Sequence, residues 1–277
     1  MPSVEQNLDL WNKTYDWSKS GDEWSSAWGG TDVMWQKSLY PRIKDLLPAP
    51  VILEIAPGFG RCTAYLKNYC ERLHVVDLSP RCIDACKQRF AGESHISYYV
   101  NDGKSLEMIP DNSIDFAFSF DSLVHVQAEV MEAYVQQLSR KLKPAGRGFI
   151  HHSNLGSYRG TRLFHRYLKK MGLGEVINNK GVLIDPVWRG DDMTADKFDR
   201  YCTKYGLHCT NQELINWANQ GYLIDSLSTF TADKNWAGKR IVQANPNFMQ
   251  EVQECRMQAE SAQKQAGSRA AEAPVAG

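Results

Sequence analysis

The sequence predicts an α/β fold with a doubly wound, mostly parallel sheet. Between residues 49 and 154, short apolar runs alternate with helix-like runs. Such alternation is typical of a parallel sheet that carries helices on both faces. The first apolar run, 51–55, is stopped by Pro57 and Gly58, as expected where a buried strand ends.

Local signals place the other elements of this core. Ser79 and Pro80 begin one helix, because Ser is a favourable N-cap and Pro suits the first helical turn. The turn 143–146, which contains Pro144 and Gly146, ends another helix. We therefore expect strands at 51–55, 73–78, 96–100, 114–120 and 148–152, and helices over 63–70, 80–90 and 130–142.

The regions around this core differ from it in composition. Residues 1–48 are rich in tryptophan, and we expect them to form an N-terminal helical cap. The main domain is predicted over 49–248. Within it, residues 155–220 mix Gly, Arg and aromatic side chains, which favours a lid or substrate insertion before the last strands. Because small-molecule sites need walls that exclude water, we expect the cap and the insertion to cover the site.

The last part of the chain is expected to complete the sheet. Two strand-like runs, 222–230 and 240–244, lie on either side of a polar turn at 234–238, and we predict that they form a hairpin. Residues 249–277 are predicted as a C-terminal helix and a tail. From about 261 to 277 the chain lacks apolar periodicity, so we expect this tail to be disordered.

Charge limits the class of partner. Lys+Arg and Asp+Glu are equal at 32 each, so the formal net charge is zero. No global basic field would draw the protein to nucleic acid or to an anionic membrane, although a local basic patch is compatible with this balance. We therefore expect a small-molecule substrate, no nucleic-acid partner and no membrane partner. The sequence does not predict an oligomeric state.

The expected compartment is the cytoplasm. No segment is long and apolar enough to span a bilayer, and residues 1–6 are polar, without a signal-peptide apolar stretch. The chain has seven cysteines and no C-x-x-C pair. Cys82 and Cys86 share one face of a predicted helix. In a cytosolic setting we expect these cysteines to be small, reduced side chains without a metal.

Polar or glycine residues follow three successive predicted strands. Gly58 and Gly60 lie in a strand-to-helix turn, where glycine lets the backbone approach a ligand closely. Asp77 ends the second strand, and an acidic side chain there can accept hydrogen bonds from both ribose hydroxyls. Asp102 and Gly103 follow the third strand and offer a carboxylate for an adenine amino group. Since parallel strands end at one edge, these groups predict a nucleoside site that suits NAD or S-adenosylmethionine.

The same stretches resemble the motifs of the class I S-adenosylmethionine-dependent methyltransferases. LEIAPGFGR resembles the first motif, VVDLSP the second, NDG the third, DNSIDFAFSFDSLVHV the fourth, and KLKPAGRGFI the stretch that leads into the fifth strand. Ala56 and Pro57 stand where many members have Gly-Cys or Gly-Ser, but Ala is small enough to fit. Thr63 replaces the third glycine of a dinucleotide-binding fingerprint, which favours a methyltransferase over a dehydrogenase.

This resemblance implies a Rossmann-like fold, methyl transfer as the activity and S-adenosylmethionine as the cofactor. It places Glu54 and Gly58 near the methionine portion, Asp77 at the ribose, and Leu78 against the adenine. The cofactor residues that it implies are Glu54, Ala56, Gly58, Gly60, Asp77, Leu78, Asp102, Gly103 and Phe120.

A general base is expected on the substrate side, beyond the fourth and fifth strands. A hydroxyl acceptor must lose a proton, and His125 is the first candidate to take it. Asp121 lies one turn earlier and would orient the imidazole ring if the segment is helical. His151 and His152 alternate faces of a strand, and His152, nearer the strand end, is the second candidate. Each residue also has a structural alternative, as a helix cap or a packed histidine, and the same set would suit a divalent metal.

The substrate itself is only broadly predicted. The histidines and aromatic residues favour O-methylation of a hydroxyl on a sugar or another small polar metabolite, and the chain lacks the N/D-P-P-Y motif that resembles DNA amino methyltransferases. The alternatives are N-methylation of a small molecule, a nucleotide-dependent oxidoreductase and a catalytically inactive cofactor-binding protein. The substrate contacts expected from the insertion are Tyr158, Arg159, Arg162, Trp188 and Arg189.

Overall fold

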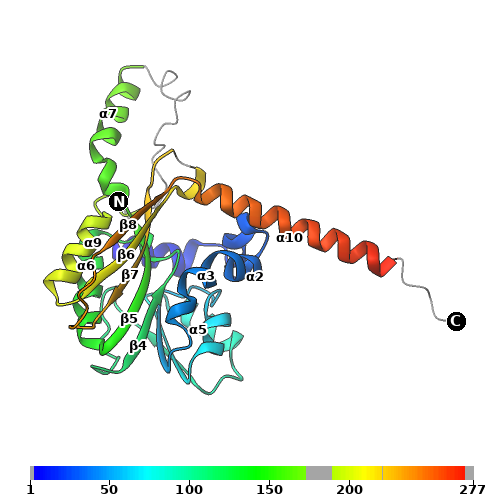
Figure 1. Cartoon of the computed structure of the whole chain (residues 1–277), viewed down its shortest axis with the longest axis horizontal. Helices are drawn as coiled ribbons and strands as arrows, with labels where there is room; N and C mark the ends of the chain where they lie inside the picture. The colour runs from blue at the N-terminus through cyan, green and yellow to red at the C-terminus, as the bar shows by residue number, and fades with distance from the viewer. Residues whose placement is uncertain (1–2, 173–188, 220, 272–277) are drawn as a thin grey trace.

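The computed structural model of the chain describes residues 3–172, 189–219 and 221–271. Within these residues, eight strands form one sheet in the order β3-β2-β1-β4-β5-β7-β6-β8 (Figure 1). The strands from β3 to β5 in this order are parallel, β7 is antiparallel to its two neighbours, and β8 is parallel to β6, which confirms the predicted mostly parallel sheet. The strands are β1 (Val51–Ile55), β2 (Arg72–Asp77), β3 (Ile96–Val100), β4 (Ile114–Ser119), β5 (Leu142–Ser153), β6 (His208–Ile215), β7 (Asp225–Thr231) and β8 (Ile241–Asn245).

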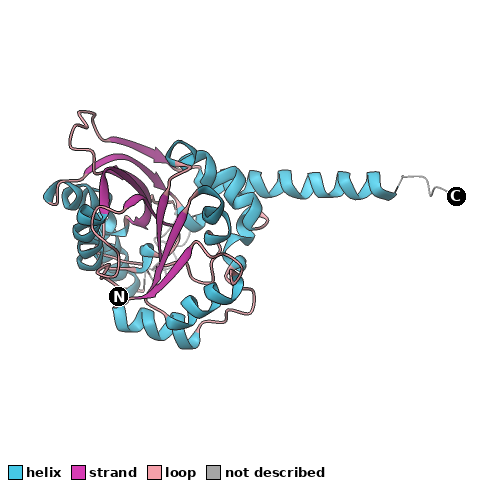
Figure 2. Ribbon diagram, turned by 90° about the horizontal axis from the view of Figure 1, so that it is seen from below, coloured by secondary structure: helices cyan, strands magenta, loops and turns pink. Residues whose placement is uncertain are grey.

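Helices pack on both faces of this sheet (Figure 2). One face carries α2, α3, α4, α5 and the start of α10, and the other face carries α6 and α9. The Ser79 hydroxyl accepts a hydrogen bond from the Cys82 N–H at 3.3 Å, so the predicted cap of α5 is present. The helices are α1 (Val4–Asp9), α2 (Thr31–Val33), α3 (Tyr40–Ile43), α4 (Thr63–Leu66), α5 (Pro80–Arg89), α6 (Ala128–Lys141), α7 (Arg159–Lys170), α9 (Ala195–Lys204) and α10 (Phe248–Ala271).

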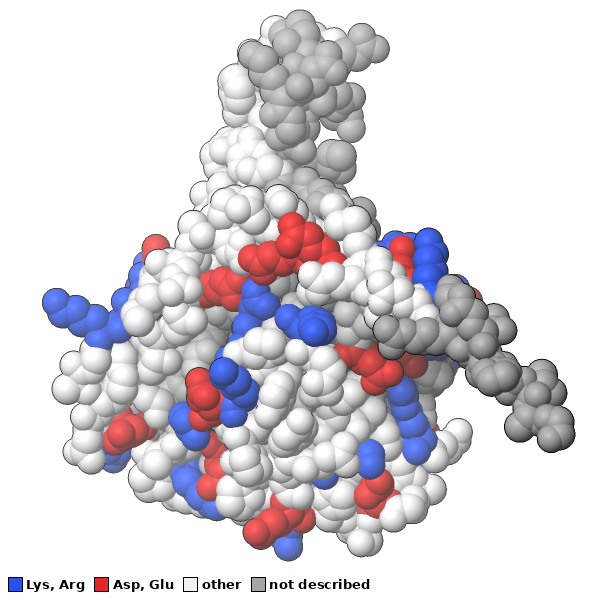
Figure 3. Space-filling model, turned by 45° about the vertical axis from the view of Figure 1, so that its right-hand side comes forward, with Lys and Arg blue, Asp and Glu red and all other residues white. Residues whose placement is uncertain are grey.

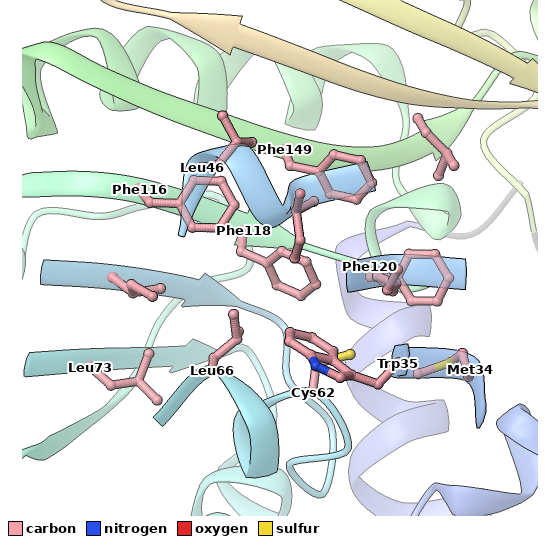
Figure 4. Close-up of a cluster of buried hydrophobic side chains, with 14 of the residues drawn as sticks. Met34, Trp35, Leu46, Cys62, Leu66, Leu73, Phe116, Phe118, Phe120 and Phe149 are labelled. Atoms are coloured by element: carbon pink, nitrogen blue, oxygen red, sulfur yellow. The ribbon is translucent and has the colours of Figure 1, made fainter. Parts of the chain in front are cut away.

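An aromatic core joins the sheet to the N-terminal helices (Figure 4). Phe116 and Phe118 of β4 face the same side because side chains alternate along a strand, and Phe149 of β5 stacks on Phe118 with 5.9 Å between ring centroids. The fully buried Trp35 lies in this cluster and stacks on Tyr65 at 4.8 Å. Buried rings of this size contribute strongly to stability, so the core holds the N-terminal segment against the sheet edge where the site lies.

The predicted hairpin at the end of the chain is wrong. β7 pairs with β5 and β6, whereas β8 pairs with β6, so the two predicted strands are not neighbours. The strand β6 lies inside the segment 155–220, which we predicted to be a lid insertion. It was missed because its eight residues include Asn211, Gln212 and Glu213, and the buried positions Cys209 and Gln212 do not read as an apolar strand.

Two element boundaries also differ from the predictions. Helix α10 continues through Ala271, so the disorder predicted for residues 261–271 is wrong, and residues 272–277 lie outside the described part of the chain. Strand β5 begins at Leu142, and the residues predicted as the turn 143–146 form an irregularity within it, between the paired positions Leu142 and Arg147. No helix among the described residues is long and apolar enough to cross a membrane.

All seven cysteines lie within the described residues. All seven are free thiols, and Cys82 and Cys86 are buried on the same side of α5. Burial raises the pKa of both thiols, which keeps them protonated near neutral pH. Within the described residues, no group of His, Cys, Asp or Glu is arranged to hold a metal ion.

Candidate functional site

A cavity of about 110 Å³ lies at the carboxyl ends of β1, β2 and β4. This is the edge at which open parallel sheets bind their ligands. Its walls come from the strand ends, from the turn after β1, from the segment after β4 and from the N-terminal segment. Most of the predicted cofactor residues line it, namely Glu54, Ala56, Gly58, Asp77, Leu78, Gly103 and Phe120.

Asp77 is a buried carboxylate at the end of β2. Its Oδ1 accepts a hydrogen bond from the Ser79 N–H at 2.8 Å, and its Oδ2 accepts one from the Gly58 N–H at 3.3 Å. Burial raises the pKa of Asp77 to about 6, while these backbone donors lower it. The two N–H groups fix the carboxylate at the cavity wall and leave lone pairs that can accept hydroxyl groups.

Glu54 is the second buried acid of the cavity. Its Oε2 accepts a hydrogen bond from the Thr63 hydroxyl at 2.5 Å, across the turn that joins β1 to α4. The pKa of Glu54 is raised to about 7, chiefly by burial and also by the charge of Asp77, against the lowering effects of the Thr63 bond and Arg61. A nearby cation would favour the ionised form of this buried carboxyl group.

The backbone after β1 and β3 takes the left-handed conformation that favours glycine. Gly58 has φ +60° and Gly103 has φ +83°. A Cβ on Gly58 would approach the Trp17 ring to 3.1 Å, and one on Gly103 would approach the Val4 side chain to 2.8 Å. These glycines therefore let the N-terminal segment lie directly over the cavity floor.

Two predicted cofactor residues do not line the cavity. A Cβ on Gly60 would lie 2.5 Å from the Phe90 ring, so this glycine allows the turn to pack on α5. Asp102 is exposed, and its Oδ1 accepts hydrogen bonds from the N–H groups of Lys104 (3.0 Å) and Ser105 (2.6 Å). Its carboxylate stabilises the local turn.

An aromatic wall closes the cavity from the N-terminal side. Trp11, Trp17 and Trp24 all line it, and Trp17 stacks on Phe59 with parallel rings 4.4 Å apart. The Trp17 indole N–H donates to the Trp11 backbone carbonyl at 2.9 Å, which holds the Trp17 ring in position. The cap therefore contributes directly to the site, as we expected of the Trp-rich region.

A buried ion pair fixes the segment that follows β4. The Arg61 guanidinium lies 3.0 Å from the Asp121 carboxylate and donates to the Ser25 hydroxyl at 3.2 Å. Asp121 has φ +61°, so the segment turns sharply here and lacks the helical geometry on which its orienting role toward His125 depended. Among the described contacts, the carboxylate of Asp121 is bound by Arg61 and not by His125.

His125 lies on the cavity wall, in a short 3₁₀ turn after β4. Its ring centroid is 5.3 Å from that of Trp11, and its backbone carbonyl accepts a hydrogen bond from the Asn7 side chain at 3.1 Å. The first candidate base is thus placed beside the aromatic wall of the cavity.

The two adjacent histidines of β5 have different surroundings. His152, the candidate that the sequence favoured, is fully buried away from the cavity, where its ring stacks on Phe198 at 4.7 Å and its Nε2 lies 2.8 Å from the Ser228 hydroxyl. Burial lowers the pKa of His152 to about 4, so the ring is neutral. His151 faces the side of the site, and its Nδ1 accepts the Asp121 N–H at 3.1 Å.

A buried charged network supports His151 from behind. The Nε2 of His151 lies 3.2 Å from Asp225, and the Arg189 guanidinium lies 2.9 Å from the same carboxylate oxygen. Although burial raises the pKa of Asp225, the charges of Arg189 and His151 hold it below its usual value. This network links β5 and β7 to the turn that carries Asp121.

The predicted substrate contacts lie elsewhere. Arg189 belongs to the buried network, and the Tyr158 hydroxyl accepts a hydrogen bond from the Leu223 N–H at 3.1 Å. Arg159 is exposed at the start of α7, and Arg162 lies 3.4 Å from Asp191. None of these four lines the cavity within the described residues, and Trp188 lies outside the described residues.

Sequence reasoning missed several residues of the cavity, including Asn7 and Arg61. The only signal for Arg61 was its place directly after the glycine turn, where a long cation can reach the next strand end. Nothing local marks Asn7, because its contact with the His125 carbonyl joins residues 118 positions apart.

Comparisons with known proteins identify the kind of domain that the middle of the chain resembles. A family model described as a methyltransferase domain matches residues 53–150. A phosphoethanolamine N-methyltransferase of Plasmodium falciparum is 27% identical over 96 residues, which are 34% of this chain and 36% of that protein. A ribosomal RNA small subunit methyltransferase A of Prochlorococcus marinus is 37% identical over 71 residues, 25% of each chain. The chain thus spans about a third or less of the length of these relatives.

The solved structures support the fold. A SAM-dependent methyltransferase of Methanosarcina mazei superposes with a TM-score of 0.52 and 17% identity, covering 70% of this chain and 97% of that one. One of Aquifex aeolicus gives a TM-score of 0.51 and 12% identity over 79% of this chain and 100% of that one. With the family match, they confirm the resemblance that the five motifs predicted.

Proposed function

We propose that this chain, whose residues 53–150 form a class I S-adenosylmethionine-dependent methyltransferase domain, transfers a methyl group to a small polar acceptor held in the cavity under the N-terminal segment. One observation carries the proposal. Residues from three strand ends, among them Glu54, Asp77 and Gly103, line one cavity whose opposite wall is aromatic.

The described residues fit S-adenosylmethionine, the cofactor of this domain family. The lone pairs of Asp77 suit the ribose hydroxyls, and the buried Glu54 suits a nearby ammonium group, which would relieve the cost of its ionisation. Gly58 and Gly103 leave the backbone open to close approach. The cofactor supplies a methyl carbon on a sulfonium, which is already activated for displacement.

The chain's own part in the reaction is then positioning, exclusion of water and proton transfer. Trp11, Trp17 and Trp24 shield the cavity from solvent. The ion pair of Arg61 with Asp121 holds the turn after β4 in place, and positioning of this kind carries much of the catalysis in a displacement reaction. His125 lies at the cavity wall, where a ring nitrogen can accept the proton of an acceptor hydroxyl.

A hydroxyl acceptor, on a sugar or another small polar metabolite, remains our first candidate. It is supported by His125 beside the Trp11 ring, because aromatic rings stack on apolar faces of sugars while an imidazole takes the hydroxyl proton. A small amine is the second candidate. It is supported by the acids Glu54 and Asp121 in the wall, by the tryptophan faces and by the N-methyltransferase among the relatives.

A product assay tests the proposal. The protein is incubated with methyl-labelled S-adenosylmethionine and with separate pools of small sugars, small amines and RNA, and the labelled product is identified by mass spectrometry. A methyl ether on a sugar or metabolite supports the first candidate, and a methylamine supports the second. Label in the RNA pool, with none in the small-molecule pools, contradicts a small-molecule acceptor.

A further inference from the structure

Helix α7 stands out from the body of the molecule (Figure 1). Four large apolar side chains on it or directly after it are more than half exposed: Leu163 (52%), Phe164 (59%), Tyr167 (60%) and Met171 (57%). This is the densest group of exposed large apolar residues in the described chain. Apolar patches of this kind on a protein surface mark sites of interaction.

The exposed residues form a stripe along the helix. Leu163, Tyr167 and Met171 are spaced by four residues and therefore lie one above the other, with Phe164 beside them. In Figure 3 the described part of the projection at the top of the molecule is white, without charged side chains in that view. The four apolar residues of this stripe are exposed.

A second stripe on α7 is basic. Arg159, Arg162, Arg166 and Lys170 are spaced by three or four residues, which places them on another face of the helix. No Asp or Glu occurs between residues 155 and 172. Arg162 is partly neutralised because Asp191 lies 3.4 Å away, so the exposed Arg159, Arg166 and Lys170 supply most of the local positive charge.

We propose that α7 binds the surface of an anionic lipid bilayer. Its apolar stripe enters the boundary between headgroups and acyl chains, and its basic stripe lies at the lipid phosphates. A projecting helix with Leu, Phe and Tyr on one face and Arg and Lys on another has the composition of helices that lie in the membrane interface. The chain does not cross the bilayer in this arrangement, and its zero net charge leaves α7 as the local source of attraction.

Charge complementarity favours a lipid surface over a second copy of the chain. If two copies joined through their α7 stripes, the basic residues of both helices would lie close together, and residues 155–172 contain no acid to pair with them. A nucleic acid would satisfy the basic stripe but would leave Leu163, Phe164 and Tyr167 in water. An anionic bilayer, unlike these two alternatives, satisfies both stripes at once.

Vesicle co-sedimentation tests the proposal with the full chain. Wild-type protein is mixed with vesicles of phosphatidylcholine alone or of phosphatidylcholine with phosphatidylglycerol. The apolar variant carries Leu163→Ser, Phe164→Ser and Tyr167→Ser, and the basic variant carries Arg166→Glu and Lys170→Glu. The matched controls are Met257→Ser, on an equally exposed methionine of α10, and Lys234→Glu with Lys239→Glu, on two exposed lysines.

We expect wild type and both controls to sediment with the anionic vesicles and not with the neutral ones, and added salt to release them. Each basic residue near such a surface contributes roughly fivefold to binding, so the basic variant should bind more than twentyfold more weakly. The apolar variant should lose binding to a similar extent. Circular dichroism spectra and melting temperatures check that both variants remain folded.

Two results overturn the proposal. One is a wild-type protein that sediments with neither kind of vesicle. The other is a wild-type dimer, seen by sedimentation velocity, that the apolar variant converts to a monomer, because a second copy would then cover the stripe. Neither result bears on methyl transfer, which is measured separately with a water-soluble acceptor.

Discussion

Arg61 and Asp121 form a buried ion pair, 3.0 Å long, between the turn after β1 and the turn after β4. Less than a tenth of either side chain is exposed. The pair therefore connects the two strand ends between which the cavity opens, and Ser25 adds a contact from the N-terminal segment.

Removing one partner of this pair should lower the free energy of unfolding strongly, and removing the second partner as well should add less than its single effect. Removing one partner of a buried pair leaves the other uncompensated and costs about 3 to 5 kcal/mol. We expect Arg61→Ala and Asp121→Asn each to lower the free energy of unfolding on this scale, and the double variant to be less destabilised than the sum. Urea denaturation of the four proteins measures the coupling. Additive effects would mean that the two side chains do not depend on each other.

Glu54 should make the ligand-free protein less stable at alkaline pH. Its pKa in the folded chain is raised from 4.5 to about 7 by burial. A carboxyl group whose pKa is higher in the folded state than in the unfolded state stabilises the fold at low pH. This contribution to the free energy of unfolding, here up to about 3 kcal/mol, is lost as the pH rises through the folded pKa. Glu54→Gln removes this loss, so its melting temperature should exceed that of wild type at pH 8, and the difference should vanish near pH 4. Equal melting curves at pH 8 would contradict the burial of an ionised Glu54.

The central strands of the fold were predictable because they are apolar runs with clear ends. Pro57 and Gly58 stop β1, and Ser79 with Pro80 begins α5, so local signals fix both boundaries. Strand β6 was not predictable in this way, since its buried positions include Gln212, whose amide donates to the Ser228 hydroxyl at 2.9 Å. A polar side chain can be buried when it is hydrogen-bonded to a neighbouring strand, and the sequence of its own strand then shows no apolar pattern.

The cofactor side of the cavity was more predictable than the acceptor side. Asp77 and Gly58 are fixed by their places at strand ends, which sequence order reveals. The partners of Asp121 and His125 come from distant segments, Arg61 and Asn7 respectively. For the two histidines of β5, alternation required that only one face the site, but which one depended on the packing of α9 against the sheet.

His125 should matter for turnover and not for cofactor binding. If it is the base for a hydroxyl acceptor, His125→Ala should lower kcat by about a hundredfold or more, the usual scale of general base catalysis. Its affinity for S-adenosylhomocysteine should stay that of wild type. Normal turnover in a variant that melts early would assign His125 a structural role and leave proximity as the source of the rate.

His152, on the neighbouring strand β5, provides the contrasting case. Its pKa is lowered from 6.5 to about 4 by burial, whereas the unfolded chain is protonated below about 6.5. The unfolded state therefore binds more protons between pH 6.5 and 4, and the stability that His152 contributes is lost as the pH falls through this window. In His152→Gln this part of the pH dependence should disappear while turnover per folded molecule is kept. A large loss of kcat with normal stability would instead mean that His152 acts in catalysis.

The most direct test of a nucleoside site built on Asp77 is calorimetric titration with S-adenosylhomocysteine and with NAD. Wild type should bind S-adenosylhomocysteine and not NAD. Asp77→Ala loses charge-assisted hydrogen bonds worth about 1.5 to 3 kcal/mol, so its affinity should fall about ten- to a hundredfold. Asp102→Ala is the matched control, because this carboxylate is exposed and holds only its own turn, and it should bind as wild type does. Binding of NAD alone, or an Asp77→Ala variant with unchanged affinity for S-adenosylhomocysteine, would contradict the account.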